Sequence, residues 1–340
     1  MSNKKLLIGY VNTNDLASMN EDDIKALTGI NIAFGTVNEG KVVWNGDHTR
    51  DGLQRIRDLN PEIKIILSIG GWSAGGFSEA AATEEGRKLF AETAAEIVRD
   101  YELDGMDIDW EYPAISMAGI GASPEDKYTF TYLLESCREA LDALGGEYKM
   151  LTIAAGGDAY FCRNTEMDKV AALCDYVQIM TYDLRGGYSH ATGHHTNLYT
   201  PQFDFYDVSA DTGVKVFEAA GVPREKIVIG AAFYSRCWRG VPNADNGYNQ
   251  YAETVGQSGQ TYDKLVDEFI GKNGFERFWD DSAKAPWLFD GETFISYDDP
   301  ESLKHKVQYL KDEGLLGIMY WEYGCAVKHS LTQVLRDAIG

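Results

Sequence analysis

Short apolar runs alternate with amphipathic stretches along almost the whole chain. Eight of the runs have the length and composition of strands that are buried on both faces. These runs are Leu6–Val11, Ile30–Val37, Ile63–Gly70, Leu103–Glu111, Met150–Ala155, Tyr176–Tyr182, Ile227–Phe233 and Gly317–Trp321. Stretches such as Glu84–Tyr101 lie between them, with apolar residues at every third or fourth position, as in a helix. Repeated strand–helix units predict an α/β fold, and a closed (β/α)8 TIM barrel is the simplest arrangement.

Helix-start signals and one irregular segment refine this prediction. Ser123-Pro124 and Asp299-Pro300, each followed by an acid, predict helices that begin at about Pro124 and Pro300. From Trp238 to about Thr293 the chain is rich in polar, glycine and aromatic residues, with one helical stretch at Tyr262–Ile270. We therefore predict a barrel formed by residues 1–237 and 294–340 and a small α+β insertion domain formed by residues 238–293. A long ordered loop is the alternative.

The charge balance limits the partners of the chain. Its 340 residues include 31 Lys and Arg against 53 Asp and Glu, a net charge of −22. Such a charge repels phosphate backbones and anionic lipid surfaces. We therefore expect neither nucleic acid nor a membrane as a partner. No run of about 18 apolar residues predicts a transmembrane helix.

The N-terminus and the cysteines bear on the compartment. The apolar run Leu6–Val11 is too short for the core of a signal peptide. We expect a secreted protein if a leader has been removed, and a cytoplasmic protein otherwise. The cysteines are odd in number and lack CxxC spacing, which predicts buried thiols, with a disulfide as the alternative. They are Cys137, Cys162, Cys174, Cys237 and Cys325.

The fourth predicted strand carries a row of acids. On a strand, Asp107, Asp109 and Glu111 point to one face, and the three apolar residues between and before them point to the other. Successive carboxylates are then roughly 6.6 Å apart, close enough for one charge to raise the pKa of the next. In a parallel barrel Glu111 lies outermost, at the face where active sites form. A carboxyl kept protonated by its neighbours predicts a general acid.

Two other readings of the acidic row are weaker. A bound cation would need a wrapping loop, and the strand-like alternation does not provide one. A solvated edge strand would leave Met106, Ile108 and Trp110 exposed on the far face. Asp104 faces away from the row, which indicates a structural role.

Aromatic and small residues gather at other strand ends. The third strand ends at Gly70-Gly71 followed by Trp72, and paired glycines let a ligand approach the backbone closely. Tyr182 and Asp183 follow the sixth strand, and Trp321 ends the last one. Flat rings at the catalytic face of a barrel suit the apolar faces of sugar rings. A neutral sugar also fits an acidic protein without a basic patch.

With these residues in view, the sequence resembles family 18 of the glycoside hydrolases, the chitinase family. The resemblance covers nearly the whole chain and rests on three motifs in the family's order. DxxDxDxE is matched by Asp104, Asp107, Asp109 and Glu111; SxGG by Ser68, Gly70 and Gly71; and QxMxYD by Gln178, Met180, Tyr182 and Asp183. The resemblance implies hydrolysis of chitin or chitooligosaccharides without a metal or another cofactor, by a chain that we expect to be a monomer.

The resemblance also implies a mechanism. In this family the N-acetyl carbonyl of the substrate attacks the anomeric carbon, so the enzyme supplies no nucleophile. Carried over by position, Glu111 protonates the glycosidic oxygen, Asp109 orients the acetamide, and Asp107 shares a proton or hydrogen bond with Asp109. Tyr182 bonds the acetamide oxygen, and Trp321 forms the floor under the distorted sugar. Further substrate contacts carried over in the same way are Tyr10, Phe34, Trp72, Met180, Asp183, Tyr234 and Arg236.

Three alternatives remain open at this point. One is an endo-β-N-acetylglucosaminidase that acts on another N-acetylglucosamine-containing glycan, and another is a chitin-binding lectin on the same fold. The lectin is disfavoured because Glu111 is present together with both aspartates. The third is a metal-dependent hydrolase that uses His190, His194 and His195, but these show no ligand-like spacing.

Overall fold

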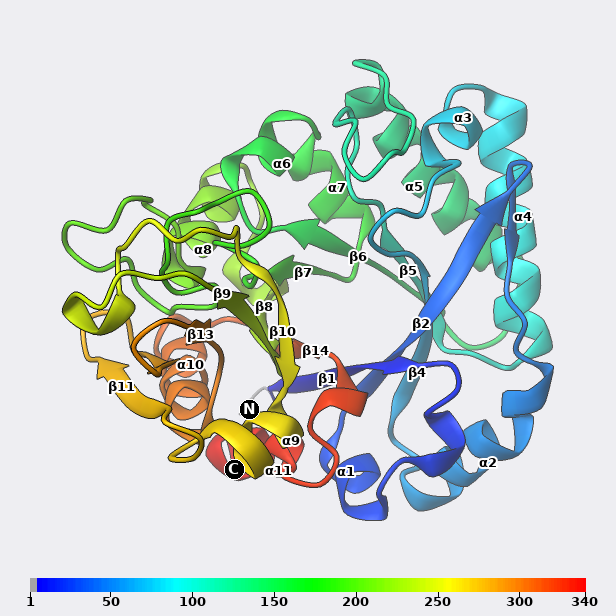
Figure 1. Ribbon diagram of the computed structural model, residues 1–340. Helices are drawn as coiled ribbons and strands as arrows, with labels where there is room; N and C mark the ends of the chain where they lie inside the picture. The colour runs from blue at the N-terminus through cyan, green and yellow to red at the C-terminus, as the bar shows by residue number, and fades with distance from the viewer. Residues whose placement is uncertain (1–4) are drawn as a thin grey trace.

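The structure, a computed structural model, describes residues 5–340 and contains a closed barrel of eight parallel strands (Figure 1). Strands β1 and β14 are neighbours, and β1 also pairs with β2, which closes the circle. The predicted (β/α)8 barrel is confirmed. Its strands are β1 (Leu6–Asn12), β2 (Gly29–Asn38), β4 (Lys64–Gly70), β5 (Gly105–Asp109), β6 (Met150–Gly156), β7 (Tyr176–Met180), β8 (Ile227–Ala232) and β14 (Gly317–Trp321).

Helices surround the barrel, and a short strand, β3 (Lys41–Val43), extends β2 as a hairpin that the pattern did not predict. The predicted helix Glu84–Tyr101 and the predicted start at Pro300 agree with α4 and α10 to within a residue. The helices are α1 (Glu21–Ala26), α2 (Arg50–Leu59), α3 (Phe77–Ala81), α4 (Glu84–Asp100), α5 (Asp126–Ala143), α6 (Ala159–Arg163), α7 (Met167–Leu173), α8 (Ala210–Ala219), α9 (Tyr262–Lys264), α10 (Pro300–Asp312) and α11 (Leu331–Ile339).

Several predicted boundaries were wrong by two residues; strand β7, for example, ends at Met180 rather than Tyr182. Helix α5 begins at Asp126 rather than Pro124, because the Asp126 carboxylate accepts hydrogen bonds from Ser78 Oγ and from the backbone N–H of Ser123. Strand β5 ends at Asp109 rather than Glu111. The outermost acid of the row therefore lies just beyond the strand.

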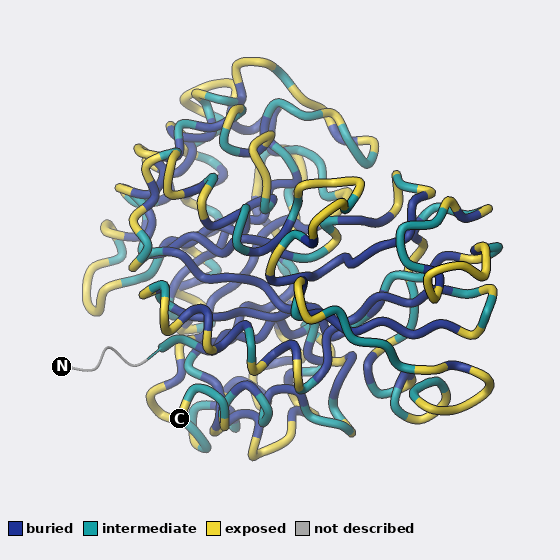
Figure 2. The backbone as a smooth tube through the Cα atoms, turned by 90° about the vertical axis from the view of Figure 1, so that its left-hand side faces the viewer, coloured by how far each residue is buried: buried dark blue, intermediate teal, exposed yellow. Residues whose placement is uncertain are grey.

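The core has two layers in the barrel and a third apolar cluster around Trp238, and buried segments run through the middle of the molecule (Figure 2). The larger layer fills the space between strands and helices and includes Met106, Ile108 and Trp110 of the acidic segment. A smaller apolar cluster lies inside the barrel. The outward-facing residues of the segment are therefore held in the larger core, which turns Asp107 and Asp109 towards the barrel interior.

A second sheet of five antiparallel strands follows the seventh barrel strand. It begins at Tyr234, before the predicted insertion, and ends at Ser296, after it. The predicted helix Tyr262–Ile270 is α9 followed by a π-helical turn, Leu265–Phe269. The strands in spatial order are β10 (Gln257–Thr261), β9 (Tyr234–Trp238), β13 (Phe294–Ser296), β12 (Ala285–Phe289) and β11 (Glu276–Asp280).

The five cysteines are free thiols. Three of them are buried, as expected, but Cys162 and Cys237 are only half-buried, because one lies on the short helix α6 and the other on β9 of the second sheet. Among residues 5–340, no helix is long and apolar enough to cross a membrane.

Candidate active site

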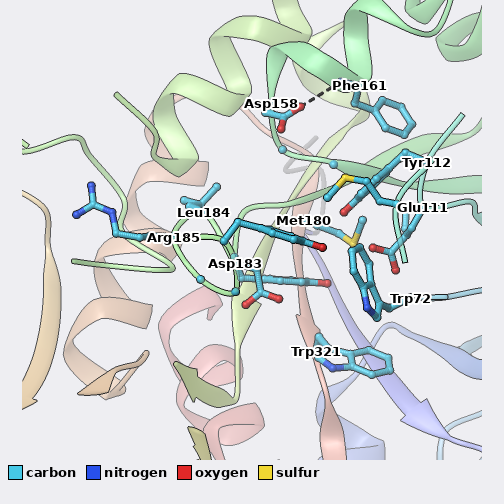
Figure 3. A pocket seen from close by; sticks show the side chains of 18 of the residues that line it. Trp72, Glu111, Tyr112, Asp158, Phe161, Met180, Asp183, Leu184, Arg185 and Trp321 are labelled. Atoms are coloured by element: carbon cyan, nitrogen blue, oxygen red, sulfur yellow. Dashed lines mark hydrogen bonds between the residues drawn. The ribbon is translucent and has the colours of Figure 1, made fainter. Parts of the chain in front are cut away.

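A cleft of about 950 Å³ opens where the barrel strands end (Figure 3). This volume is at the upper end of the range for ligand pockets. With the exception of Asp107, every residue predicted for the site lines it. These residues are Tyr10, Phe34, Trp72, Asp109, Glu111, Met180, Tyr182, Asp183, Tyr234, Arg236 and Trp321.

Asp107 lies below the cleft, fully buried in the barrel interior. Its Oδ2 accepts hydrogen bonds from Ser68 Oγ at 2.7 Å and Tyr10 Oη at 2.9 Å. Its Oδ1 accepts from Thr152 Oγ1 at 2.7 Å and Gln178 Nε2 at 3.0 Å. Burial raises the pKa of Asp107, and the four donors oppose that shift. The carboxylate is thus saturated with donors from four different barrel strands.

Asp109 is two residues further along the same row, 4% exposed. Its Oδ1 is buried and has no hydrogen-bond partner within residues 5–340. Burial, followed by the charges of Glu111 and Asp107, raises the pKa of Asp109 well above its ordinary value. A carboxyl group that lines a cleft and has a buried oxygen free of partners is suited to bond a polar group of a ligand.

Glu111 lines the same cleft and is 8% exposed. Burial is the main cause that raises its pKa, to about 7, from an ordinary value of 4.5. The negative charge of Asp183 acts in the same direction, and a hydrogen bond with Tyr112 opposes it. A carboxyl that is protonated near neutral pH can act as a general acid.

Tyr182 reaches into the cleft from just beyond β7. Burial, followed by the charges of Asp109 and Glu111, raises its pKa well above the ordinary value, so the phenol keeps its proton. Its hydroxyl makes one long contact, 3.9 Å to the sulfur of Met319. The phenol is therefore a donor available to a ligand next to both acids.

Asp183 follows Tyr182 and is held by cationic and polar groups. The guanidinium of Arg236 donates from both Nε, at 2.6 Å, and Nη2 to the Asp183 carboxylate. His195 Nδ1 is 3.5 Å from the same carboxylate. Burial raises the pKa of Asp183, but hydrogen bonds with His195 and Arg236 more than offset this and bring the pKa below its ordinary value. Asp183 is thus a fixed negative charge on the cleft wall.

Aromatic rings form the floor and one wall of the cleft. The rings of Trp321 and Phe34 stack at 5.4 Å between centroids, with 19° between their planes. Tyr10 packs edge-on against Trp321 at 5.9 Å. Trp72 is half-exposed, and its ring is 6.5 Å from that of Tyr112. Flat apolar surfaces therefore flank the acids.

Family comparison agrees with this geometry. The chain matches the family described as "Glycosyl hydrolases family 18" over residues 7–325. The chain belongs to family 18 of the glycosyl hydrolases. Chitinase A1 of Niallia circulans is 40% identical over 293 residues, which are 79% of this chain and 42% of that protein. Chitinase B of Serratia marcescens is 29% identical over 412 residues, covering 95% of this chain and 81% of that protein.

A solved structure is more similar still to this family 18 chain. It is described as a glycoside hydrolase family 18 N-acetylglucosaminidase from Paenibacillus barengoltzii, with 50% sequence identity and a TM-score of 0.97. The superposition covers 98% of this chain and 99% of that one. The likeness therefore includes the second sheet as well as the barrel.

Several cleft residues of the family 18 chain were missed by the sequence reasoning. Tyr112 follows Glu111 directly, and Asp158 and Phe161 follow the glycine pair Gly156-Gly157 at the end of β6. That pair repeats the glycine signal of the third predicted strand, which could have marked the sixth strand end as part of the site. Arg185 and Tyr206 come from the loop after β7, where no local pattern indicates which side chains face the cleft.

The three histidines of that loop are engaged separately. His194 Nε2 is 3.3 Å from Asp280 Oδ2, and His190 Nδ1 is 3.2 Å from the carbonyl of Ala252. His195 contacts Asp183, as described above. Within residues 5–340, no group of three or more His, Cys, Asp or Glu side chains has an arrangement that could hold a metal ion.

Proposed function

We propose that the chain hydrolyses β-1,4 bonds between N-acetylglucosamine units of chitin or chitooligosaccharides, with retention of anomeric configuration and Glu111 as general acid and base. Membership of family 18 and relatives named as chitinases support the substrate class. The observation that carries the proposal is Glu111 itself. It lines the cleft with a pKa raised to about 7, beside an Asp109 oxygen left free of partners.

Bond breaking begins with the proton of Glu111. It passes to the glycosidic oxygen while the bond from that oxygen to the anomeric carbon breaks. The carbonyl oxygen of the substrate's own acetamide forms the new bond to that carbon, giving an oxazolinium ion. Water then attacks the same carbon while the bond from that carbon to the acetamide oxygen breaks, and the Glu111 carboxylate takes a proton from the water. Two inversions restore the starting configuration.

Asp109 and Tyr182 hold the acetamide during this exchange. The free Asp109 oxygen is placed to accept a hydrogen bond from the acetamide N–H, which turns the carbonyl towards the anomeric carbon. The protonated Tyr182 phenol donates to the acetamide oxygen. Asp107, saturated by its four donors, acts through Asp109 as a positioning residue.

The aromatic side chains supply binding. Trp321 offers its face to the sugar whose bond is cleaved, and Tyr10, Phe34 and Met180 pack around it. Trp72 provides a half-exposed ring to a neighbouring sugar. Arg236, Asp183 and Tyr234 form a polar wall that contacts hydroxyl or acetamide groups.

The Glu111→Gln variant tests this assignment. Gln keeps the shape of Glu111 but has no acidic proton, so we expect turnover of chitotetraose to fall by about 10³-fold or more. Binding of chitotetraose, measured by calorimetry, should persist. Glu166→Gln, which alters a carboxylate on the outside of the barrel hydrogen-bonded to Thr131, is the matched control and should keep full activity. Unchanged turnover in Glu111→Gln would overturn the assignment.

Release of single N-acetylglucosamine units is the second candidate, favoured by the description of the 50% identical structure as an N-acetylglucosaminidase. Products from chitopentaose separate the two modes. Early di- and trisaccharides indicate internal cleavage, whereas early monosaccharide with tetrasaccharide indicates cleavage at a chain end. The residues assigned above lie in one chain, so we propose a monomer, which sedimentation velocity tests.

A further inference from the structure

Exposed aromatic rings gather beside the cleft on the loop after β7 and on the second-sheet side of the molecule. Phe203 is 87% exposed, Phe205 49%, Tyr206 46% and Tyr251 71%. We call these four residues the aromatic platform. The rings of Phe205 and Tyr251 are 5.5 Å apart, although the two residues are far apart in the sequence. Exposed aromatic rings that come together in this way, as those of Phe205 and Tyr251 do, mark a site of interaction.

A buried ion pair fixes the loop that carries the platform. The side chain of Asp204, between Phe203 and Phe205, pairs with the guanidinium of Arg185, and both groups are almost fully buried. The hydroxyl of Tyr248, which lies between β9 and β10, donates a hydrogen bond to the same Asp204 carboxylate. Arg185 also lies over the Tyr206 ring, 4.8 Å from its centroid. The rings therefore sit on a rigid polar anchor.

The backbone around the platform is held in the same way. Ala191 and Tyr251 form an antiparallel bridge, and the N–H of Ala252 donates to the carbonyl of His190 at 2.8 Å. Asn249 Nδ2 donates to the carbonyl of Phe203 at 3.4 Å. Tyr251 and Phe203 thus keep fixed positions although their side chains are in solvent.

Phe203 carries backbone strain in addition to its exposure. Its φ is +68°, in the left-handed region that a bulky aromatic residue rarely adopts. An exposed phenylalanine in such a conformation lowers stability twice, by strain and by apolar exposure. Neither effect is compensated by packing, so stability alone does not explain a phenylalanine here.

The aromatic platform adjoins the cleft. Tyr206 and Arg185 line the cleft and also belong to the platform or its anchor. Arg185 lies at the edge of the cleft side chains in Figure 3, away from the acids. The one cation of the anchor is neutralised by Asp204, so the platform suits a neutral ligand with flat apolar faces.

We propose that the aromatic platform binds the pyranose faces of a chitin chain outside the cleft and holds the polymer against the enzyme. The inference rests on the proposed function for the identity of the polymer. A short oligosaccharide fills the cleft without reaching Phe203, Phe205 or Tyr251, whereas a chain of insoluble chitin covers both the cleft and the aromatic platform. The platform therefore affects the polymer and not the short substrate.

A triple variant, Phe203→Ala with Phe205→Ala and Tyr251→Ala, tests the proposal. We expect its affinity for insoluble chitin, measured by depletion from solution, to fall by about tenfold. Hydrolysis of chitotriose should be unchanged. Tyr128→Ala with Tyr132→Ala, which removes two exposed rings from the outer surface of α5, is the matched control and should bind chitin as the parent does.

The single variant Phe203→Gly distinguishes a loss of chitin binding from a loss of folding. Glycine adopts φ near +68° without strain, so we expect Tm to rise by about 2 °C while chitin binding weakens. Unchanged chitin binding in the triple variant would overturn the platform. A change in self-association by sedimentation velocity, without a change in chitin binding, would overturn it in favour of a protein contact. Absence of chitotriose hydrolysis in the unmodified enzyme would overturn the proposed function instead, and the binding comparison would still decide the platform.

Discussion

Carboxyl groups at two levels of the barrel interior differ in their hydrogen-bond partners. At the lower level, Asp107 has four donors around its two oxygens. At the upper level, Asp109 has a buried oxygen without a partner in the described chain, and Glu111 has an elevated pKa. A fold built for stability alone would satisfy both levels. The contrast indicates that the lower level supports the fold and the upper level is kept open for a ligand.

After Glu111→Gln, the largest effect on catalysis should come from Asp109→Asn. We expect kcat for chitotriose to fall by about 10²- to 10³-fold, because an amide oxygen accepts the acetamide N–H more weakly than a carboxylate does, and the NH2 group of Asn cannot accept it at all. Stability should not fall, since the buried Oδ1 of Asp109 has no hydrogen bond to lose. Urea unfolding beside steady-state kinetics checks both statements. A drop of several kcal/mol in the free energy of unfolding would show that the upper level is structural.

Asp107→Ala should show the opposite balance, with a fall of at least about 4 kcal/mol in the free energy of unfolding. Four buried donors lose their acceptor, and each unsatisfied group costs about 1 kcal/mol or more. Thr152→Val is the graded control, because it removes one of the four donors and should lower stability by about 1 kcal/mol. A fall in the free energy of unfolding that is no larger for Asp107→Ala than for Asp109→Asn would remove the contrast between the two levels.

Glu111→Gln should stabilise the protein in a pH-dependent manner. The folded pKa of Glu111, about 7, lies above its ordinary value of 4.5, so folding favours the protonated form. The contribution of Glu111 is full below about pH 4.5 and is lost as pH rises through about 7. Gln does not ionise, so the stability of the variant should exceed that of the parent increasingly as pH rises above about 4.5, by up to about 3 kcal/mol at pH 8. Thermal or urea unfolding at pH 5 and pH 8 measures the difference, and a gain that is the same at both pH values would contradict it.

The barrel and the acidic row could be predicted because their signals are local. Apolar runs separated by helical periods require only neighbouring residues, and the alternation through Asp107 and Asp109 follows from the two-residue period of a strand. The family motifs then pointed to Tyr182 and Trp321, which line the cleft as expected.

Other parts of the site depend on contacts that no local pattern encodes. The four donors of Asp107 come from positions 10, 68, 152 and 178, which are brought together only by barrel closure. The pair Arg185–Asp204 depends on how one loop folds against the second sheet. Helix α5 begins late for a similar reason, because Asp126 is recruited by Ser78 of another helix.

The most direct test of the central claim is the dependence of kcat/KM on pH for chitotriose. Glu111 acts as an acid only while it holds its proton. The enzyme should therefore be active at pH values below the pKa of Glu111 and lose activity above it. We predict that kcat/KM falls with a single pKa of about 7 and about tenfold per pH unit beyond it. A profile that stays flat to pH 9, or that already falls near pH 4.5, would contradict the assignment of Glu111 as the proton donor.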